Sequence, residues 1–228
     1  MISSQNYSAK TVLWLVLSSG PLLALGCQAW PFGARERTSI ITPAMRVATI
    51  QEIGARADGT NNAEQTDLVN QLALQIRTEP DPLVRRAIQE AVGEYRTPLA
   101  RDVLLAGLHD GDSNVRRTCC LELSEQEGSQ IVASLSHVLQ QDKDQDVRMA
   151  AVDALSRFRS PESIAALAIA LEDRDPAMQY AGVRALRDLS GQDLGNDVNA
   201  WRQYAAGETP AIQPNISVAE HLKRLSPF

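Results

Sequence analysis

Apolar residues between positions 81 and 189 follow a helical spacing, and this spacing starts again about every 31 residues. In each copy, apolar or small residues stand at a first position and at the third, fourth and eighth residues after it, which is one face of an α-helix. The first positions, Val84, Val115, Val147 and Met178, are 31, 32 and 31 residues apart. The pattern therefore predicts four repeated helices.

An aspartate precedes each of these helices: Asp81, Asp112, Asp144 and Asp175. A carboxylate at this place accepts hydrogen bonds from the free amides of the first turn. In two copies a proline, Pro82 or Pro176, comes next, where a missing N–H costs nothing. Local chemistry thus predicts where each helix begins.

A second set of helices precedes the first. Residues 66–77, 98–108, 130–139 and 163–171 also show helical apolar spacing, and short turns join one pair to the next. A hairpin with one apolar side cannot bury that side alone, so neighbouring hairpins must stack. Only 4% of the residues are aromatic, which favours helix packing over strands. We predict an all-α fold, an α-solenoid of stacked helical hairpins.

The ends of this array carry signs of capping units. Thr42 and Pro43 start a further helical pattern that runs to Arg56, and residues 198–204, which include Trp201, predict a short last helix. A solenoid needs atypical terminal units to cover its open ends. We therefore expect the solenoid, with its capping helices, to span residues 42–206.

The repeat over residues 66–190 resembles short HEAT-like repeats of about thirty residues, of the phycobilin-lyase-like type, in which a helix-starting Asp and a Val-Arg pair are characteristic. The resemblance implies a HEAT-like or ARM-like superhelix. It also implies that an Arg of one unit contacts the Asp of an adjacent unit, forming a ladder that ends at Gln179, which replaces the fourth Arg. The implied members are Asp81, Asp112, Asp144, Asp175, Arg85, Arg116 and Arg148.

The amino terminus has the zones of a secretory signal. Lys10 precedes an apolar run from Val12 to Gly26 that is shorter than a membrane-spanning helix and contains Pro21. The run ends in Ala24-Leu25-Gly26-Cys27, which resembles the lipobox of bacterial lipoproteins. The resemblance implies cleavage after residue 26 and a lipid anchor on Cys27. The alternative is an uncleaved signal anchor with Cys27 as an ordinary thiol.

The remaining segments follow from this interpretation. Residues 27–41 have no period and are expected to form a membrane tether, and residues 207–228 a C-terminal tail with one short helix over 217–225. Gln28, which is not an Asp, favours the outer over the inner membrane in lipoproteins sorted by that residue. We therefore expect a lipid-anchored protein on the periplasmic side of the cell envelope.

Charge argues against a nucleic-acid partner. The chain has 22 Lys and Arg against 28 Asp and Glu, a formal net charge of −6, and loss of Lys10 with the signal peptide makes the balance −7. An acidic protein without a basic cluster repels a phosphate backbone.

Candidate catalytic groups are few and scattered. His109, His137 and His221 show no metal-ligand spacing and are expected to be solvated. Cys119 and Cys120 lack a Cys-x-x-Cys arrangement, and Cys119 is expected to be a small core thiol. Residues 191–197 combine glycines and acids, but a helix-ending Gly and a helix-capping Asp explain them without an ion. We expect no enzyme activity, cofactor or metal.

The sequence thus favours a scaffold that binds a protein or peptide. The outward stripe of the repeated helices is the candidate partner surface: Arg86, Glu90, Arg117, Asp153, Tyr180 and Arg184. The alternatives are a chromophore lyase or chaperone, which the implied family branch includes, and a purely structural envelope spacer.

Overall fold

The computed structural model describes residues 41–210, and every element within that range is an α-helix. This confirms the predicted all-α solenoid. The ten helices are α1 (Pro43–Gly54), α2 (Ala63–Ile76), α3 (Pro82–Gly93), α4 (Pro98–Gly107), α5 (Ser113–Leu123), α6 (Ser129–Gln141), α7 (Gln145–Leu155), α8 (Pro161–Leu171), α9 (Pro176–Ser190) and α10 (Val198–Ala205). The signal segment, Cys27, residues 27–40 of the tether and residues 211–228 of the tail lie outside the described residues.

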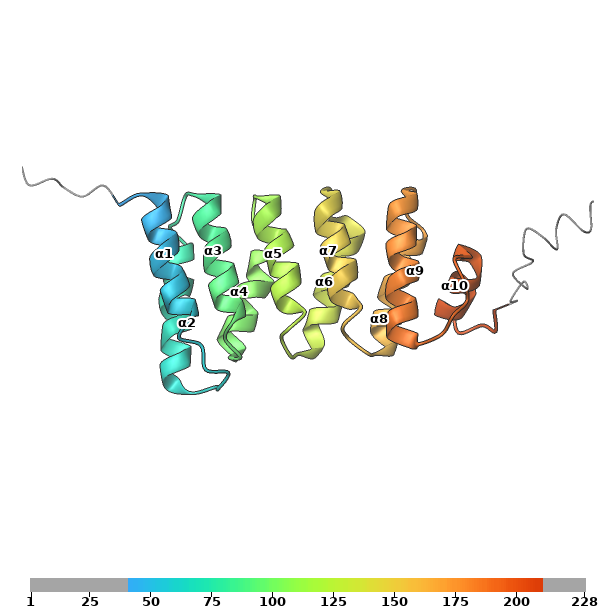
Figure 1. The fold of residues 1–228 in the computed structure, drawn as a ribbon, viewed down its shortest axis with the longest axis horizontal. Helices are drawn as coiled ribbons and strands as arrows, with labels where there is room; N and C mark the ends of the chain where they lie inside the picture. Colours follow the sequence, from blue (N-terminus) through green and yellow to red (C-terminus); the bar gives the residue numbers. More distant parts are fainter. Residues whose placement is uncertain (1–40, 211–228) are drawn as a thin grey trace, which may run out of the picture. The chain divides into compact units, whose positions relative to one another are not determined.

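The helices of residues 41–210 form two layers (Figure 1). Each odd-numbered helix packs against the next odd-numbered one, from α1 to α9, and this layer faces the viewer in Figure 1. The even-numbered helices lie behind it and pack against the odd ones, with α2 against α4, α6 against α8, and α8 against α10. Each hairpin buries its apolar side between the layers and against its neighbours, as expected for a solenoid.

The helices begin where their capping side chains stand. Asp81, Asp112, Asp144 and Asp175 each accept a hydrogen bond from a first-turn amide, as predicted. The α2 helix begins at Ala63, three residues before the predicted start, because the Asn62 side chain accepts from the Gln65 amide.

The core lies between the layers and uses the repeated apolar positions. Val84, Val115, Val147 and Met178 are each 0% exposed, as are all four residues eight positions further on. Small residues bring neighbouring helices together: a Cβ atom on Gly182 would lie 3.0 Å from the Cβ of Ala170 on α8. The sequence repeat is therefore a packing repeat.

The first and last helices cover the ends of the array. Tyr95, in the turn between α3 and α4, is buried, and its hydroxyl donates to the Ile53 carbonyl of α1 at 2.5 Å. Trp201 of α10 is 0% exposed, and its indole N–H donates to the Gly195 carbonyl at 2.9 Å. The α10 helix packs against α8 and α9, so Trp201 covers the end of the array that these two helices form.

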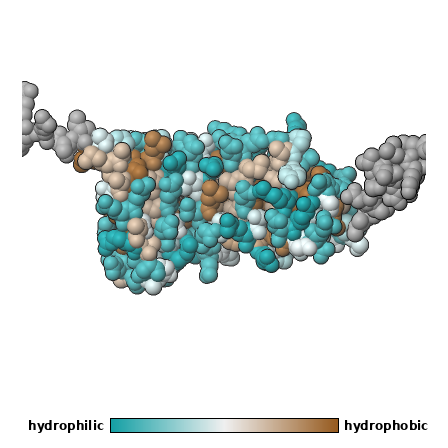
Figure 2. All heavy atoms as spheres, in the orientation of Figure 1, coloured by the Kyte–Doolittle hydropathy of each residue, from teal (hydrophilic) through white to brown (hydrophobic). Residues whose placement is uncertain are grey.

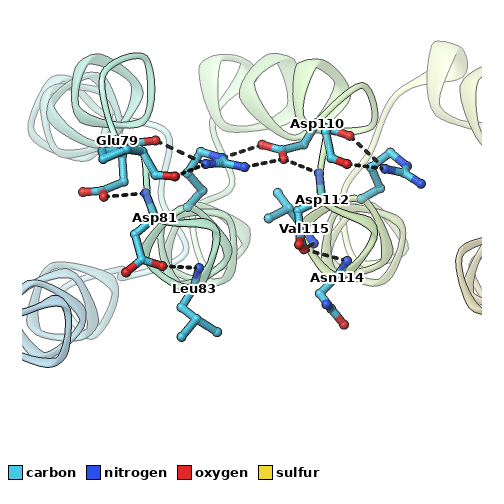
Figure 3. A network of polar contacts seen from close by, with 11 residues as sticks. Glu79, Asp81, Leu83, Asp110, Asp112, Asn114 and Val115 are labelled. Atoms are coloured by element: carbon cyan, nitrogen blue, oxygen red, sulfur yellow. Dashed lines mark hydrogen bonds and ion pairs between the residues drawn. The ribbon is translucent and has the colours of Figure 1, made fainter.

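A ladder of Arg–acid ion pairs, the edge ladder, joins neighbouring units where the odd-numbered helices begin (Figure 3). Arg85 pairs with Asp110 of the next unit at 2.8 Å, and Arg116 pairs with Asp142 at 2.7 Å. Each guanidinium also donates to a carbonyl of the loop before its own helix. The other rungs are Arg46–Glu79 at 3.0 Å and Arg148–Asp173 at 3.6 Å.

The structure corrects the predicted partners of this ladder. The arginines were expected to contact Asp112, Asp144 and Asp175, the capping residues of the next unit; they contact the acids two residues earlier, Asp110, Asp142 and Asp173. The capping carboxylates are turned toward their own first-turn amides. The earlier acid is held in place by the capping residue, because the Asp112 N–H donates to Asp110 Oδ1 at 2.9 Å (Figure 3).

Gln179 takes the ladder position on α9. Its side-chain amide donates at 2.8 Å to the carbonyl of Asp173, in the loop before its own helix. Within residues 41–210, Arg148–Asp173 is the last rung of the edge ladder.

Candidate interaction surface

The six residues of the predicted partner surface lie on the exposed side of the odd-numbered layer, which we call the odd face. Arg86 and Glu90 stand on α3, Arg117 on α5, Asp153 on α7, and Tyr180 and Arg184 on α9. They occupy two positions of the repeat, the second and sixth residues after the first apolar residue. The face seen in Figure 2 is mostly hydrophilic, with smaller hydrophobic areas.

Four of these six residues pair with one another. Arg86 and Glu90 form an ion pair at 3.2 Å within α3, and Arg184 of α9 reaches Asp153 of α7 at 2.7 Å. Arg157, just after α7, likewise pairs with Glu125, just after α5, at 2.9 Å, a contact that the sequence did not suggest. Much of the charge on the odd face is therefore already neutralised within the molecule.

Arg117 and Tyr180 are the two predicted residues left for a partner. Arg117 is exposed and has no ion-pair partner among the described residues, and Tyr180 is 57% exposed. Met149 of α7 occupies the same repeat position between them, and Leu121, one turn after Arg117, is 39% exposed. We call these four residues the α5–α9 row. Sequence reasoning missed Leu121 and Met149, although both share the repeat positions of the predicted stripe.

A hollow of about 520 Å³ lies beside this row, between α5 and α7. Its lining is mainly polar: Leu121, Glu122, Ser124, Glu125, Asp153, Ala154, Ser156 and Arg157.

Glu122 has an unusual environment at the edge of this hollow. Its side chain lies across Gly93 of α3, where an added Cβ atom would be 2.1 Å from Glu122 Oε2. Burial, with smaller contributions from Glu94 and Glu90, raises the pKa of Glu122 to about 7. This carboxyl therefore takes up a proton close to neutral pH.

The cysteines and histidines have the environments expected of structural residues. Cys119 and Cys120 are 0% exposed free thiols, and burial raises the pKa of Cys120 to about 12 and that of Cys119 well above its ordinary value. Thiols held protonated in this way are weak nucleophiles. His109 and His137 are exposed, and His221 lies outside the described residues.

The loop between α9 and α10 is explained by helix ends, as predicted. Gly191 ends α9 with φ of +70°, and the Asp197 side chain accepts from the Asn199 amide at the start of α10. Arg187 of α9 also donates to the Gly195 carbonyl of this loop at 2.8 Å. Across residues 41–210 no three His, Cys, Asp or Glu residues are grouped as metal ligands would be.

None of the helices within 41–210 has the length and hydropathy that a membrane span requires. A search of curated proteins found no matching relative. Among solved structures, the chain resembles human deoxyhypusine hydroxylase in complex with glycerol, with a TM-score of 0.52 and 22% identity. The alignment covers 66% of this chain but only 56% of the hydroxylase, so this likeness concerns the fold alone.

The family comparison matches the described helices directly. The model for HEAT repeats matches residues 42–124, 69–140 and 102–187, which together span α1 to α8 and most of α9. The matches begin 27 and 33 residues apart, about one hairpin each, as expected when one hairpin is the repeating unit. The chain therefore belongs to the family of proteins built from HEAT repeats.

Proposed function

We propose that this protein is a lipid-anchored, non-catalytic scaffold that binds a protein partner at the bacterial cell envelope. The α5–α9 row is the observation that carries the proposal. Most charges around it are paired within the molecule, whereas Arg117, Tyr180 and Leu121 expose a cation and two large apolar side chains. Arg and Tyr are also residue types that contribute most to protein interfaces.

The chemistry of the other candidate residues supports binding over catalysis. The two thiols of α5 are buried and protonated, which does not suit covalent attachment of a chromophore. We therefore place the protein with interaction scaffolds and not with chromophore lyases of the phycobilin-lyase-like branch.

Partner capture tests the binding proposal. The lipidated protein is purified from solubilised bacterial membranes with its bound proteins, and wild type is compared with the double variant Arg117→Glu, Tyr180→Ala. We expect the variant to lose a partner that wild type retains. Arg159→Glu is the matched control, because it reverses an exposed arginine in the turn between α7 and α8. Equal recovery from both proteins would refute the α5–α9 row, and empty captures would favour a structural spacer.

The membrane anchor needs a separate test, since Cys27 lies outside the described residues. Cells are fed an alkyne-tagged fatty acid, and the protein is examined for the tag and for membrane fractionation. We expect Cys27→Ser to abolish tagging and Cys119→Ala to retain it, because Cys119 is buried in the core. Tagging of the Cys27→Ser protein would contradict the proposed anchor.

A further inference from the structure

A second concave site lies on the even-numbered layer, away from the odd face. It is a groove of about 430 Å³ between α2 and α4, with α3 at its floor. Its lining includes Leu74, Gln89, Leu99, Val103, Ala106 and Gly107. This volume lies within the usual range for pockets that bind small molecules.

Gln89 on the floor of this groove breaks the repeat. It is 1% exposed, and its Oε1 atom has no hydrogen-bond partner. The corresponding residues of the later units are Cys120, Val152 and Val183, all buried and without polar amides. A buried amide without a partner opposes folding, so a local departure of this kind points to a role in binding.

The opposite wall is shaped to admit this amide. A Cβ atom on Gly107 would lie 2.4 Å from Gln89 Nε2, so any larger residue at position 107 would displace the side chain. The corresponding residues of α6 and α8 are Val138 and Ala170. Gln89 and Gly107 thus depart from the repeat together, and both line the same groove.

The rest of the groove selects the chemistry of its occupant. Leu99, Val103 and Ala106 provide an apolar wall on α4, and Leu74 on α2 is 57% exposed and extends the apolar surface outward. An aliphatic group would fill the space but leave Gln89 Oε1 without a donor. An indole or a phenol supplies an apolar body with one N–H or O–H donor.

We propose that this groove binds a tryptophan or tyrosine side chain of a protein partner, whose N–H or O–H donates to Gln89 Oε1 once the buried amide turns toward the groove. The exposed Leu74 then packs against residues that flank the inserted side chain, which favours a polypeptide over a free aromatic molecule. The identity of the occupant as a protein rests on the proposed scaffold function. The chemistry of the groove does not.

A titration with two matched probes tests the groove. N-acetyl-tryptophanamide carries the indole N–H, and N-acetyl-1-methyltryptophanamide lacks it. Each is added to the isotope-labelled lipidated protein in detergent, and the backbone amide signals of Leu74 and Val103 are followed by NMR. We expect saturable shifts and roughly fivefold tighter binding of the first probe, the effect of one hydrogen bond.

Gln89→Met removes the acceptor while keeping a side chain of similar length, and it should bind both probes equally. Gln130→Met, an exposed change on α6, should keep the wild-type preference. Unsaturable shifts in wild type, or an undiminished preference in Gln89→Met, would overturn the proposal. Should Gln89→Met not fold, the two probes on wild type alone still decide it. Because no partner protein is needed, this test and the partner capture can fail independently.

Discussion

The edge ladder and the odd face are built from the same repeat unit, yet they treat charge in opposite ways. On the edge ladder, an arginine at one repeat position pairs with an acid of the next unit. In the Arg116–Asp142 rung the two side chains are only 12% and 8% exposed. On the odd face, the second repeat position holds Arg86, Arg117, Met149 and Tyr180 in turn. The ladder residues join neighbouring units and therefore keep one residue type, whereas the fold leaves the residue types of the odd face free to vary.

The largest expected effect is the loss of a buried rung. Arg116→Ala leaves Asp142 without its guanidinium and should lower the free energy of unfolding by about 3–5 kcal/mol. Although burial alone would raise it, the hydrogen bond from Arg116 holds the pKa of Asp142 below its ordinary value. In wild type the contribution of this pair to stability disappears as Asp142 is protonated at acid pH. The stability of the variant, which lacks the pair, should therefore fall less between pH 7 and pH 3. Urea unfolding at pH 7 and pH 3 measures both effects.

The double variant Arg116→Met, Asp142→Leu is the control for this rung. It removes both charges, so it should cost less than Arg116→Ala. A double variant that is less stable than the single one would show that the rung stabilises through more than its charge pair.

The ladder also shows how far the sequence alone reaches. The four capping aspartates, the repeat and the arginines on its edge are local features, and each stands where the pattern predicts. The partner of each arginine is not local. Asp110 and Asp112 lie in one loop, and only the folded turn shows that Asp112 faces its own helix while Asp110 faces Arg85.

Gly107 and Gly93 both face a neighbouring helix, but the side chains packed against them differ in how easily they can move. A Cβ atom on Gly107 would meet two buried groups, Cys119 Sγ and Gln89 Nε2, each at 2.4 Å. Gly107→Ala should therefore cost about 1–3 kcal/mol of unfolding free energy. The nearest atoms to a Cβ at Gly93 all belong to the flexible Glu122 side chain, which can turn toward solvent. The cost of Gly93→Ala should therefore stay below about 1 kcal/mol, because Ala favours a helix.

Thermal or urea unfolding compares these variants, with Gly111→Ala as the control. Nothing lies within 4 Å of a Cβ atom at Gly111, so this change should be neutral. Equal losses in Gly93→Ala and Gly107→Ala would mean that Glu122 is held as rigidly as the core.

Glu122 predicts a pH effect on the odd face. Its pKa is about 7 in the folded protein against 4.5 for the free side chain, so the folded state holds the proton more strongly. Its contribution to stability is present below pH 4.5 and is lost as the pH rises through 7. Because the carboxyl is partly exposed, Glu122→Gln should gain only about 1–2 kcal/mol at pH 8 and nothing at pH 4.

Unfolding in urea at the two pH values checks this gain. Glu127→Gln, an exposed change in the turn after α5, is the control and should alter neither value. A gain that is equal at pH 4 and pH 8 would place the cause outside the titration of Glu122.

The odd face was less predictable than the ladder, for a physical reason. The spacing of the repeat gave the exposed positions, but not which charges satisfy one another across units. Asp153 and Arg184 were expected to be free for a partner, and they pair with each other because equivalent positions of stacked helices are neighbours. Leu121 and Met149 share those positions, but apolar residues in a helical repeat are more often assigned to the core.

The exposed Arg184–Asp153 pair of the odd face is expected to contribute least to stability. The Arg184–Asp153 contact has the same 2.7 Å length as the Arg116–Asp142 rung, but its side chains are 53% and 47% exposed. Arg184→Ala should therefore cost only about 0.2–1 kcal/mol, and salt near 1 M should remove most of that cost by screening. Urea unfolding of both variants at low and high salt measures the contrast. Equal losses at the two sites would mean that pair geometry, and not burial, decides how much an ion pair stabilises this solenoid.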